Sequence, residues 1–229
     1  MIYAMSDIHG FADIFQKNLE WIDLSGKNRL VLLGDYIDYG PESGRVLHLI
    51  YEMQRRYGPK KVIVLRGNHE EEFLEWLKTY GGPHAGEPDE YGLVPWNDWL
   101  LTDPNFGTFR SFLNETQWAS FRDITRTVSE DTMNIEAARL LLSVNGKLMC
   151  WLRTLKYVYE TERQIFVHAG IDEEAGDFWR QATPKYVFVG KYPASKGSFN
   201  KDISAGHVGT AHVSGDPDFH GVYHDGRSH

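Results

Sequence analysis

Short apolar runs rich in β-branched residues alternate with longer, helically spaced stretches over roughly the first eighty residues. Three of these runs predict strands, namely Ile2–Ser6, Arg29–Gly34 and Lys61–Arg66. Glu42–Tyr57, between the second and the third, carries apolar residues three or four apart, which would share one face of a helix. This order is typical of β-α-β-α-β units and predicts an α/β fold with a parallel sheet.

A polar cluster follows each of these three predicted strands. The clusters are Asp7-Ile8-His9, Gly34-Asp35-Tyr36-Ile37-Asp38-Tyr39-Gly40 and Gly67-Asn68-His69-Glu70. The residues that follow parallel strands lie at one edge of the sheet, where open α/β folds usually bind ligands. We therefore expect the three clusters to meet at a single site.

The pattern changes from Glu71 to about Tyr159, where helical spacing and dense aromatic residues predict a mostly helical insertion that packs on the sheet. A further strand is predicted at Gln164–Val167 and runs into His168. The apolar run Tyr186–Val189 follows, within a stretch, Lys185–Lys201, that we interpret as a solvated loop. Without repeats or long linkers, residues 1–229 are interpreted as one domain.

Composition narrows the function classes. Among 229 residues, 32 are Asp or Glu and 24 are Lys or Arg, giving a net charge of −8, which disfavours a protein that binds nucleic-acid backbones. No apolar run approaches the roughly 18 residues of a membrane span, and the N-terminus lacks a secretion signal, so we expect a cytoplasmic protein without membrane contact. The single cysteine, Cys150, excludes an internal disulfide and is expected to be buried.

The residue types in the polar clusters suit divalent metal ions. Carboxylate oxygens and imidazole nitrogens bind such ions, and a pair of ions needs a bridging carboxylate. Asp7 and His9 are two residues apart and could reach one ion, while Asp35 could bridge to a second. The remaining ligands of the second ion could be Asn68, His168 and His207. Such a set accepts manganese, iron, zinc or cobalt.

The order Asp-x-His, Gly-Asp-x-x-Asp-x-Gly and Gly-Asn-His-Glu resembles the signature of the calcineurin-like metallophosphoesterases. Leu65–Glu70 and Val167–Gly170 resemble, more narrowly, the phosphoprotein phosphatase branch, including its bacterial and phage members such as lambda phosphatase and the symmetrical diadenosine tetraphosphatases. The resemblance runs from Ile2 to about His212. It implies a β-sandwich flanked by helices, which periodicity alone does not predict.

The resemblance also implies how the metal ions are held. Asp7, His9 and Asp35 would bind the first ion, and Asp35, Asn68, His168 and His207 the second, with manganese the first choice. The implied reaction is direct attack on phosphorus by a hydroxide that the two metals activate. His207 depends on Gly206–Thr210, where Val208 and Gly209 depart from the family pattern, so His212 stays open as a competing ligand.

Further roles come from the same resemblance. His69 would be the general acid for the leaving group, oriented by Asp38, while Glu70 would support the metal loop. Substrate phosphate would contact Arg66, Arg180, Tyr39 and Asn68. Tyr39 is a departure, because the family usually has arginine there, and its presence predicts weaker phosphomonoester affinity or a different substrate.

Three functions remain open. The first is a serine/threonine protein phosphatase-like phosphomonoesterase, acting on a phosphorylated protein or a small phosphoester. The second is a hydrolase of dinucleoside polyphosphates, and the third a catalytically weak, metal-bearing interaction module. Family members usually continue beyond residues 225–229 with another strand or two, so we expect a short second sheet or a missing C-terminal segment.

Overall fold

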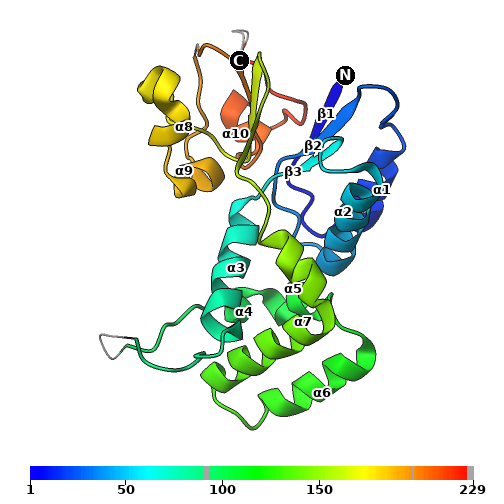
Figure 1. Cartoon of the computed structure of the whole chain (residues 1–229), viewed down its shortest axis with the longest axis vertical. Coiled ribbons are helices and arrows are strands. Elements are labelled where there is room, and N and C mark those ends of the chain that lie inside the picture. Colours follow the sequence, from blue (N-terminus) through cyan, green and yellow to red (C-terminus); the bar gives the residue numbers. More distant parts are fainter. Residues whose placement is uncertain (90–92, 198, 226–229) are drawn as a thin grey trace.

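The computed structural model describes residues 1–89, 93–197 and 199–225. Its first sheet is parallel, in the order β1-β2-β3, with β1 at Ile2–Met5, β2 at Arg29–Leu32 and β3 at Val62–Val64. Helix α1 (Ala12–Leu19) connects the first two strands and α2 (Ser43–Tyr57) the last two (Figure 1). The predicted β-α-β-α-β unit is therefore confirmed.

A second sheet lies beside the first. It contains β4 (Val158–Glu160), β5 (Gln164–Val167) and β6 (Asp202–Ser204); β4 and β5 are antiparallel, whereas β5 and β6 are parallel. The two sheets pack face to face and bury a shared apolar cluster. That cluster comprises Val31, Leu33, Ile63, Leu65 and Phe166. This is a small β-sandwich, as the family resemblance implied.

Helices cover the outer faces of the sandwich, and strand periodicity explains how. In β2, Leu30 and Leu32 point to the helical side while Val31 points to the other sheet, because alternate side chains leave opposite faces. Burial on both faces accounts for the nearly continuous apolar runs in the sequence. The outer face of the second sheet packs on Trp179 and Phe188 from the C-terminal helices.

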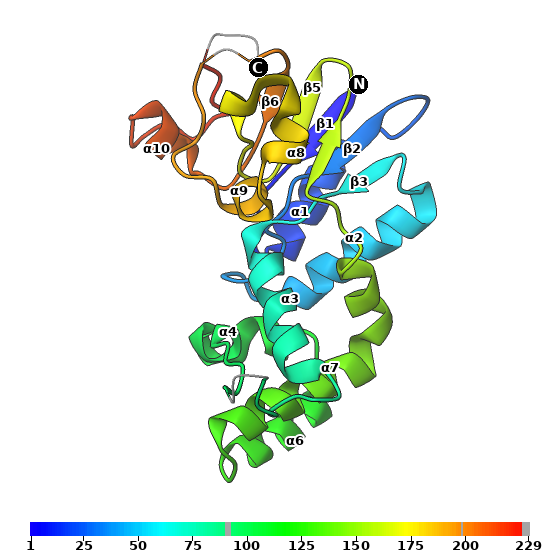
Figure 2. The same ribbon diagram turned by 60° about the vertical axis from the view of Figure 1, so that its left-hand side comes forward.

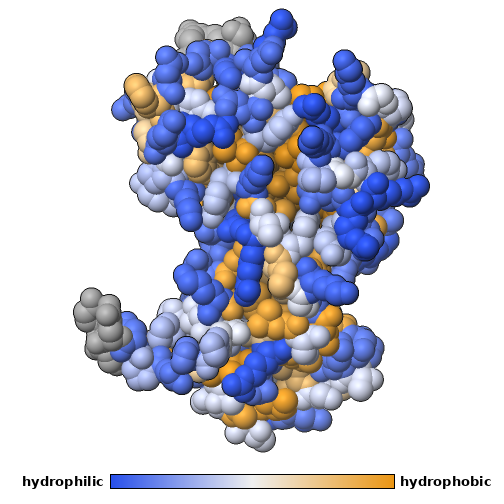
Figure 3. All heavy atoms as spheres, in the orientation of Figure 1, coloured by the Kyte–Doolittle hydropathy of each residue, from blue (hydrophilic) through white to orange (hydrophobic). Residues whose placement is uncertain are grey.

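The sequence predicted that the helical insertion packs on the sheet, but it extends away from the sheets and packs on helices instead (Figures 1 and 2). Its elements are α3 (Asn68–Gly81), α4 (Trp99–Thr102), the 3-10 helix η1 (Pro104–Phe106), α5 (Gly107–Arg110), α6 (Glu115–Thr125) and α7 (Glu130–Leu152). Helix α3 begins one turn after β3 and packs along α7. Most aromatic side chains in the described part of the insertion are buried, although Trp96 is exposed. Figure 3 shows the outline hollowed between the sheets and the insertion.

The C-terminal part differs from two expectations. It contains the 3-10 helix η2 (Glu173–Phe178), α8 (Trp179–Ala182), α9 (Lys185–Gly190) and α10 (Thr210–Ser214). Lys185–Lys201 is thus not simply a solvated loop, since α9 buries Phe188 and Val189 against the second sheet. Cys150 is exposed rather than buried, because α7 turns the neighbouring Met149 into the core instead. Residues 226–229 lie outside the described part of the chain.

None of the helices in the described ranges combines the length and the apolar character needed to cross a bilayer.

Candidate metal centre

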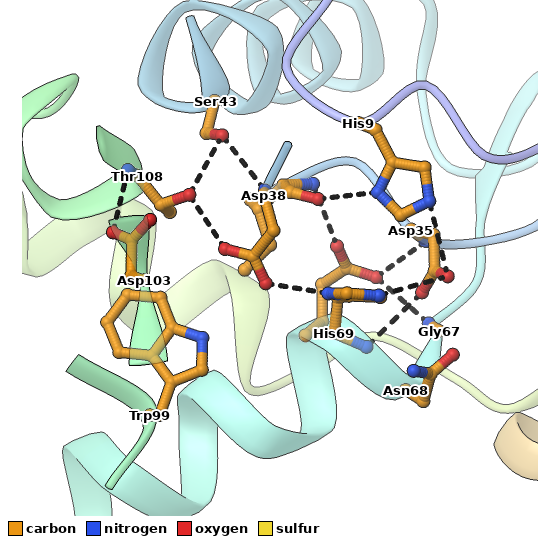
Figure 4. Close-up of polar contacts among 12 residues, drawn as sticks. His9, Asp35, Asp38, Ser43, Gly67, Asn68, His69, Trp99, Asp103 and Thr108 are labelled. Atoms are coloured by element: carbon orange, nitrogen blue, oxygen red, sulfur yellow. Dashed lines mark hydrogen bonds and ion pairs between the residues drawn. The ribbon is translucent and has the colours of Figure 1, made fainter. Parts of the chain in front are cut away.

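The loops that follow β1 and β2 are joined by backbone hydrogen bonds. The amide of Asp7 donates to the Gly34 carbonyl over 3.1 Å, and the amide of His9 donates to the Asp35 carbonyl over 3.0 Å. The loop after β3 meets them through a glycine, since a Cβ on Gly67 would overlap the Asp35 carboxylate. The three polar clusters therefore lie at one edge of the first sheet, within reach of one another (Figure 4).

Asp35 lies at the centre of this edge and is only 2% exposed. Its Oδ2 lies 3.2 Å from His168 Nε2, 3.7 Å from His9 Nε2 and 4.0 Å from His69 Nε2. Burial tends to raise the pKa of this carboxyl, but the hydrogen bond and charge of His168, together with His69, lower it below its ordinary value. A buried, ionised carboxylate thus stands between three imidazoles from three different segments.

The orientation of His9 follows from its backbone contact. His9 Nδ1 lies 2.8 Å from the Ile37 carbonyl, which can only accept, so Nδ1 carries the hydrogen. The lone pair of Nε2 is then free to face the carboxylates of Asp35 and of Asp7, whose Oδ1 is 4.0 Å away. An imidazole held in this way presents a metal-binding nitrogen to the centre.

A second group forms where the two sheets meet. His168 follows β5 and is fully buried, and its Nε2 lies 3.1 Å from Asn68 Oδ1. His168 Nδ1 is buried and has no hydrogen-bond partner within the described ranges, so Nε2 is the nitrogen through which the ring meets the centre. The His207 ring lies 5.2 Å from the His168 ring. Ligand atoms of Asp35, His168 and His207 all fall within 4.8 Å of one another.

Asp7 links this second group to the first sheet. The backbone amide of His207 donates to both carboxylate oxygens of Asp7, over 3.2 and 3.1 Å. His212, the competing candidate, instead contacts the Tyr192 hydroxyl with its Nε2. Of the two histidines, His207 is therefore the one that lies with Asp35 and His168.

The chemistry of these side chains fits divalent cations. Ligand atoms of His9, Asp35 and His69 form one compact group, and those of Asp35, His168 and His207 form another, with Asp35 common to both. Carboxylate oxygen, amide oxygen and imidazole nitrogen are the ligands that such ions take. Converging lone pairs repel one another, and cations between them would remove that repulsion.

Glu70 holds two loops in place. It is fully buried in the first turn of α3, where Oε2 accepts from the amides of Asp35 (2.9 Å) and Gly67 (3.0 Å). Oε1 accepts from the amide of Tyr36 over 2.7 Å. Burial and the nearby charge of Asp35 raise the pKa of Glu70 to about 7. Glu70 therefore holds the backbone of the loops that bear the metal-ligand candidates, and its carboxylate contacts backbone amides.

His69 and Asp38 form a dyad beside the centre. His69 Nδ1 lies 2.6 Å from Asp38 Oδ2, so Nε2 of the ring faces Asp35 (Figure 4). Burial lowers the pKa of His69, but the Asp38 hydrogen bond and the charges of Asp35 and Asp38 outweigh it and raise the pKa to about 9. This imidazole can hold a proton at Nε2 and direct it toward the centre.

The backbone at this edge is strained. Six non-glycine residues of the site adopt positive φ, namely Asp7 (56°), His9 (46°), Asp35 (57°), Asp38 (69°), Tyr39 (62°) and His207 (65°). Such conformations cost on the order of 1 kcal/mol each and persist where surrounding contacts enforce them. No local sequence signal marks them, because the hydrogen bonds that enforce them come from other loops.

Two predicted phosphate-binding residues make other contacts. Arg66 is 9% exposed, and its guanidinium contacts Glu71 at 2.6 Å, the Tyr157 hydroxyl and the Arg153 carbonyl. Arg180 pairs with Glu160, which lies opposite Ile165 in the second sheet. Ile165 is three residues before His168, about 10 Å along the strand. In this structure Glu71 and Glu160 engage the two guanidinium groups, and the contact of Arg66 and Arg180 with substrate phosphate stays a prediction.

Tyr39 lies at the exposed rim of the centre and is 78% exposed. Its ring is edge-on to His9, with the centroids 4.7 Å apart, and to His69, with the centroids 5.2 Å apart. Among the predicted substrate contacts, Tyr39 and Asn68 are thus the two that lie beside the metal-ligand candidates.

Sequence reasoning missed Ser43, Asp103 and Thr108. The Thr108 hydroxyl donates to Asp38 Oδ1 over 2.7 Å, and the Asp103 carboxylate accepts from the Thr108 amide over 2.8 Å. Asp38 and Thr108 are 70 positions apart. No spacing rule or motif in the sequence connects residues at that separation.

One family model and several curated proteins match this chain. The family model "Calcineurin-like phosphoesterase" matches residues 1–210. The symmetrical bis(5'-nucleosyl)-tetraphosphatase of Chromobacterium violaceum is 36% identical over 109 residues, which cover 45% of this chain and 38% of that protein. A putative serine/threonine-protein phosphatase of Caenorhabditis elegans is 32% identical over 97 residues, covering 42% of this chain and 26% of that one.

The matched segments span well under half the length of these curated relatives. Among solved structures, a putative diadenosine tetraphosphatase aligns with a TM-score of 0.49 at 14% identity, covering 93% of this chain and 76% of that one. The family match extends over most of the sequence and includes both sheets. This chain belongs to the calcineurin-like phosphoesterase family.

Proposed function

We propose that this protein is a metal-dependent phosphoester hydrolase, and specifically a phosphomonoesterase similar to serine/threonine protein phosphatases. One observation carries the proposal: the buried Asp35 carboxylate lies between the ligand candidates of both ions, with Oδ2 3.7 Å from His9 Nε2 and 3.2 Å from His168 Nε2, and it groups with His207 within 4.8 Å. A carboxylate shared in this way is what a pair of neighbouring cations requires. Residues 1–229 are proposed to act as one domain, in which the insertion supports the site.

Asp7, His9 and Asp35 would hold the first cation, and Asp35, Asn68, His168 and His207 the second. Two such cations lower the pKa of a water molecule between them and screen the charge of a phosphoryl group. Manganese is the first metal to test, with iron, zinc and cobalt as the others that these ligand types accept. Asn68, as well as holding metal, would face the bound phosphoester.

The dyad supplies the proton in this proposal. His69 Nδ1 donates to Asp38, and when the imidazole is doubly protonated its second proton lies on Nε2, toward Asp35. That proton would pass from Nε2 to the leaving oxygen as the ester bond breaks, which leaves an alcohol. Proton donation matters most for leaving groups that are weak acids, because these depart poorly as anions.

The test is hydrolysis by the purified chain with and without manganese. The substrates are a phosphoserine peptide, a phosphotyrosine peptide and diadenosine tetraphosphate, and the variants are Asp35→Asn and His69→Asn. We expect manganese-dependent release of phosphate from a peptide, and a loss of 100-fold or more in kcat in both variants. Metal-independent hydrolysis, or hydrolysis that survives both substitutions, would contradict the proposal.

The second candidate is hydrolysis of dinucleoside polyphosphates. It is favoured by the relatives that are named symmetrical bis(5'-nucleosyl)-tetraphosphatase. The same assay separates the two candidates, because cleavage of diadenosine tetraphosphate with no action on either peptide supports the second. If metal binds but nothing is hydrolysed, the chain is an interaction module that carries metal.

A further inference from the structure

Asp38 belongs to a closed ring of hydrogen bonds. Its backbone amide donates to Ser43 Oγ over 3.1 Å, Ser43 Oγ lies 3.3 Å from Thr108 Oγ1, and Thr108 Oγ1 donates to Asp38 Oδ1 over 2.7 Å (Figure 4). A carboxylate can only accept, so the single Thr108 hydroxyl hydrogen goes to Asp38. The Ser43 hydroxyl must then donate to Thr108, and all donors run in one direction around the ring.

This ring of hydrogen bonds fixes the orientation of the Asp38 carboxylate. Oδ1 is taken by Thr108, while Oδ2 accepts from His69 Nδ1 over 2.6 Å. Without the first bond, the carboxylate could rotate about its last torsion, and His69 would lose the fixed acceptor that keeps Nε2 toward Asp35. The angle of the imidazole therefore depends on a hydroxyl that does not touch it.

Thr108 is itself held by the insertion. It is 1% exposed on α5, and its backbone amide donates to Asp103 Oδ2, which also accepts from the amide of Phe109 over 3.3 Å. The Phe109 side chain is fully buried and packs at a tilt against Phe121 of α6, with the ring centroids 4.7 Å apart. The hydroxyl is thus fixed to the packed core of the insertion rather than to either sheet.

We propose that Thr108 is a positioning residue of the hydrolytic site: the insertion uses its hydroxyl to orient Asp38, and through Asp38 the His69 imidazole. This inference depends on the proposed function. It gives the helical insertion a role in the chemistry of the site.

The test combines three variants. Thr108→Val removes the hydroxyl at similar shape, Thr108→Ser keeps it, and Ser111→Ala is the matched control. Ser111 lies one turn away, where its Oγ accepts from the Gly44 amide over 2.8 Å and donates to the Thr108 carbonyl over 2.6 Å. Ser111 joins the insertion to α2 without contacting Asp38. The Ser111→Ala variant therefore measures how much activity is lost when that junction alone is loosened.

Kinetics with manganese would use two substrates, p-nitrophenyl phosphate, which has a good leaving group, and phenyl phosphate, which has a poor one. We expect Thr108→Val to lower kcat on phenyl phosphate about 10-fold or more, and less on p-nitrophenyl phosphate, with KM changed less than about twofold. Thr108→Ser should restore most of the activity, and Ser111→Ala should stay within about twofold of the original. An equal loss on both substrates, or no rescue by serine, would overturn the proposal.

A double-mutant cycle tests whether Thr108 acts through Asp38. In an Asp38→Ala background, adding Thr108→Val should change kcat by less than about twofold, because nothing remains to be positioned. An undiminished effect in that background would show that Thr108 acts by another route. If Thr108→Val does not fold, Thr108→Ala replaces it in the same measurements, because alanine also lacks the hydroxyl and is smaller than valine.

A measurement independent of activity separates this inference from the proposed function. The His69 Nδ1 proton is assigned by proton–nitrogen NMR through its absence in His69→Asn. It should be strongly shifted or lost in Thr108→Val but retained in Thr108→Ser and Ser111→Ala. If the chain hydrolyses none of the esters, the proposed function fails while this NMR comparison still decides the positioning role. An unchanged Nδ1 proton in Thr108→Val would refute that role.

Discussion

Tyr39 occupies the exposed rim of the candidate metal centre in a left-handed backbone conformation, with φ of 62°. Its ring packs edge-on against His9 and His69, so these two imidazoles hold the exposed side chain beside the centre. A phenol gives at most one neutral hydrogen bond to a phosphate, whereas a guanidinium gives two charge-assisted ones. The identity of this single residue should therefore set phosphate affinity.

Tyr39→Arg tests that conclusion. We expect KM for an aryl phosphate to fall about fivefold, because an exposed charge-assisted contact contributes roughly 1 kcal/mol. Tyr39→Phe is the control, since it keeps the ring against the histidines and removes only the hydroxyl. The measurement is steady-state kinetics with manganese, and unchanged KM and kcat in Tyr39→Arg would show that Tyr39 does not limit phosphate binding.

At the scale of elements, one buried side chain joins helix α3 to two loops. Glu70 accepts backbone hydrogen bonds from the loop after β2 and from Gly67, just after β3. Each of those amides is removed from water, so each needs an acceptor. The position of the first turn of α3 thereby fixes the backbone that carries Asp35.

Glu70→Gln should destabilise the protein. The amide group keeps the volume but turns an N–H toward backbone donors, so we expect the free energy of unfolding to fall by about 2 kcal/mol or more. Urea unfolding at pH 8 measures it, above the pKa of about 7 that burial gives Glu70. The control is Glu75→Gln on the same helix, where an exposed pair with Lys78 should contribute less than about 1 kcal/mol. Equal effects for the two variants would contradict the explanation.

For the whole molecule, the site depends on the packing of one sheet against the other. Asp7 and His207 are 200 positions apart, yet the His207 amide contacts the Asp7 carboxylate. The first sheet supplies the loops after its three strands, while His168 follows β5 and His207 lies just beyond β6. The apolar cluster around Phe166 holds the two sheets together, and so brings their loop residues to one place.

The stability of the whole fold should depend on the protonation of Asp103. Burial and the nearby Asp38 charge raise its pKa from 3.8 to about 6 in the folded state, although backbone amides oppose the shift. The folded protein therefore binds more protons than the unfolded chain between those values. The stabilising contribution is complete below about pH 3.8 and disappears as pH rises through about 6.

Asp103→Asn should remove this dependence. Relative to Asp103→Asn, the original chain should lose free energy of unfolding as pH rises from about 4 to about 7, measured by urea unfolding at several pH values. Asp123→Asn is the control, because Asp123 is 78% exposed and should leave the pH profile unchanged. The pKa of Asp103 would not be raised in the folded state if the difference in free energy of unfolding between the original chain and Asp103→Asn did not change with pH. The same would follow if the original chain became relatively more stable as pH rises.

Local pattern by itself determined a large part of this protein. The spacing of apolar residues predicted the strands of the first sheet and helix α2 to within a few residues, because periodicity reports directly which face an element buries. The polar residues after those strands were also readable, since parallel strands end at a common edge. The sequence did not reveal α9, because a short apolar run has no helical period long enough to recognise.

Tertiary structure decided which partners the side chains take. Arg66 and Arg180 looked suited to phosphate, yet Glu71 and Glu160 engage them, and His212 contacts Tyr192 while His207 lies with His168. Thr108 reaches Asp38 only because the insertion folds back over α2. Apart from Arg66 and Glu71, which are five positions apart, these contacts join residues 20 or more positions apart in the chain, and local spacing contains no information about the distance between such residues.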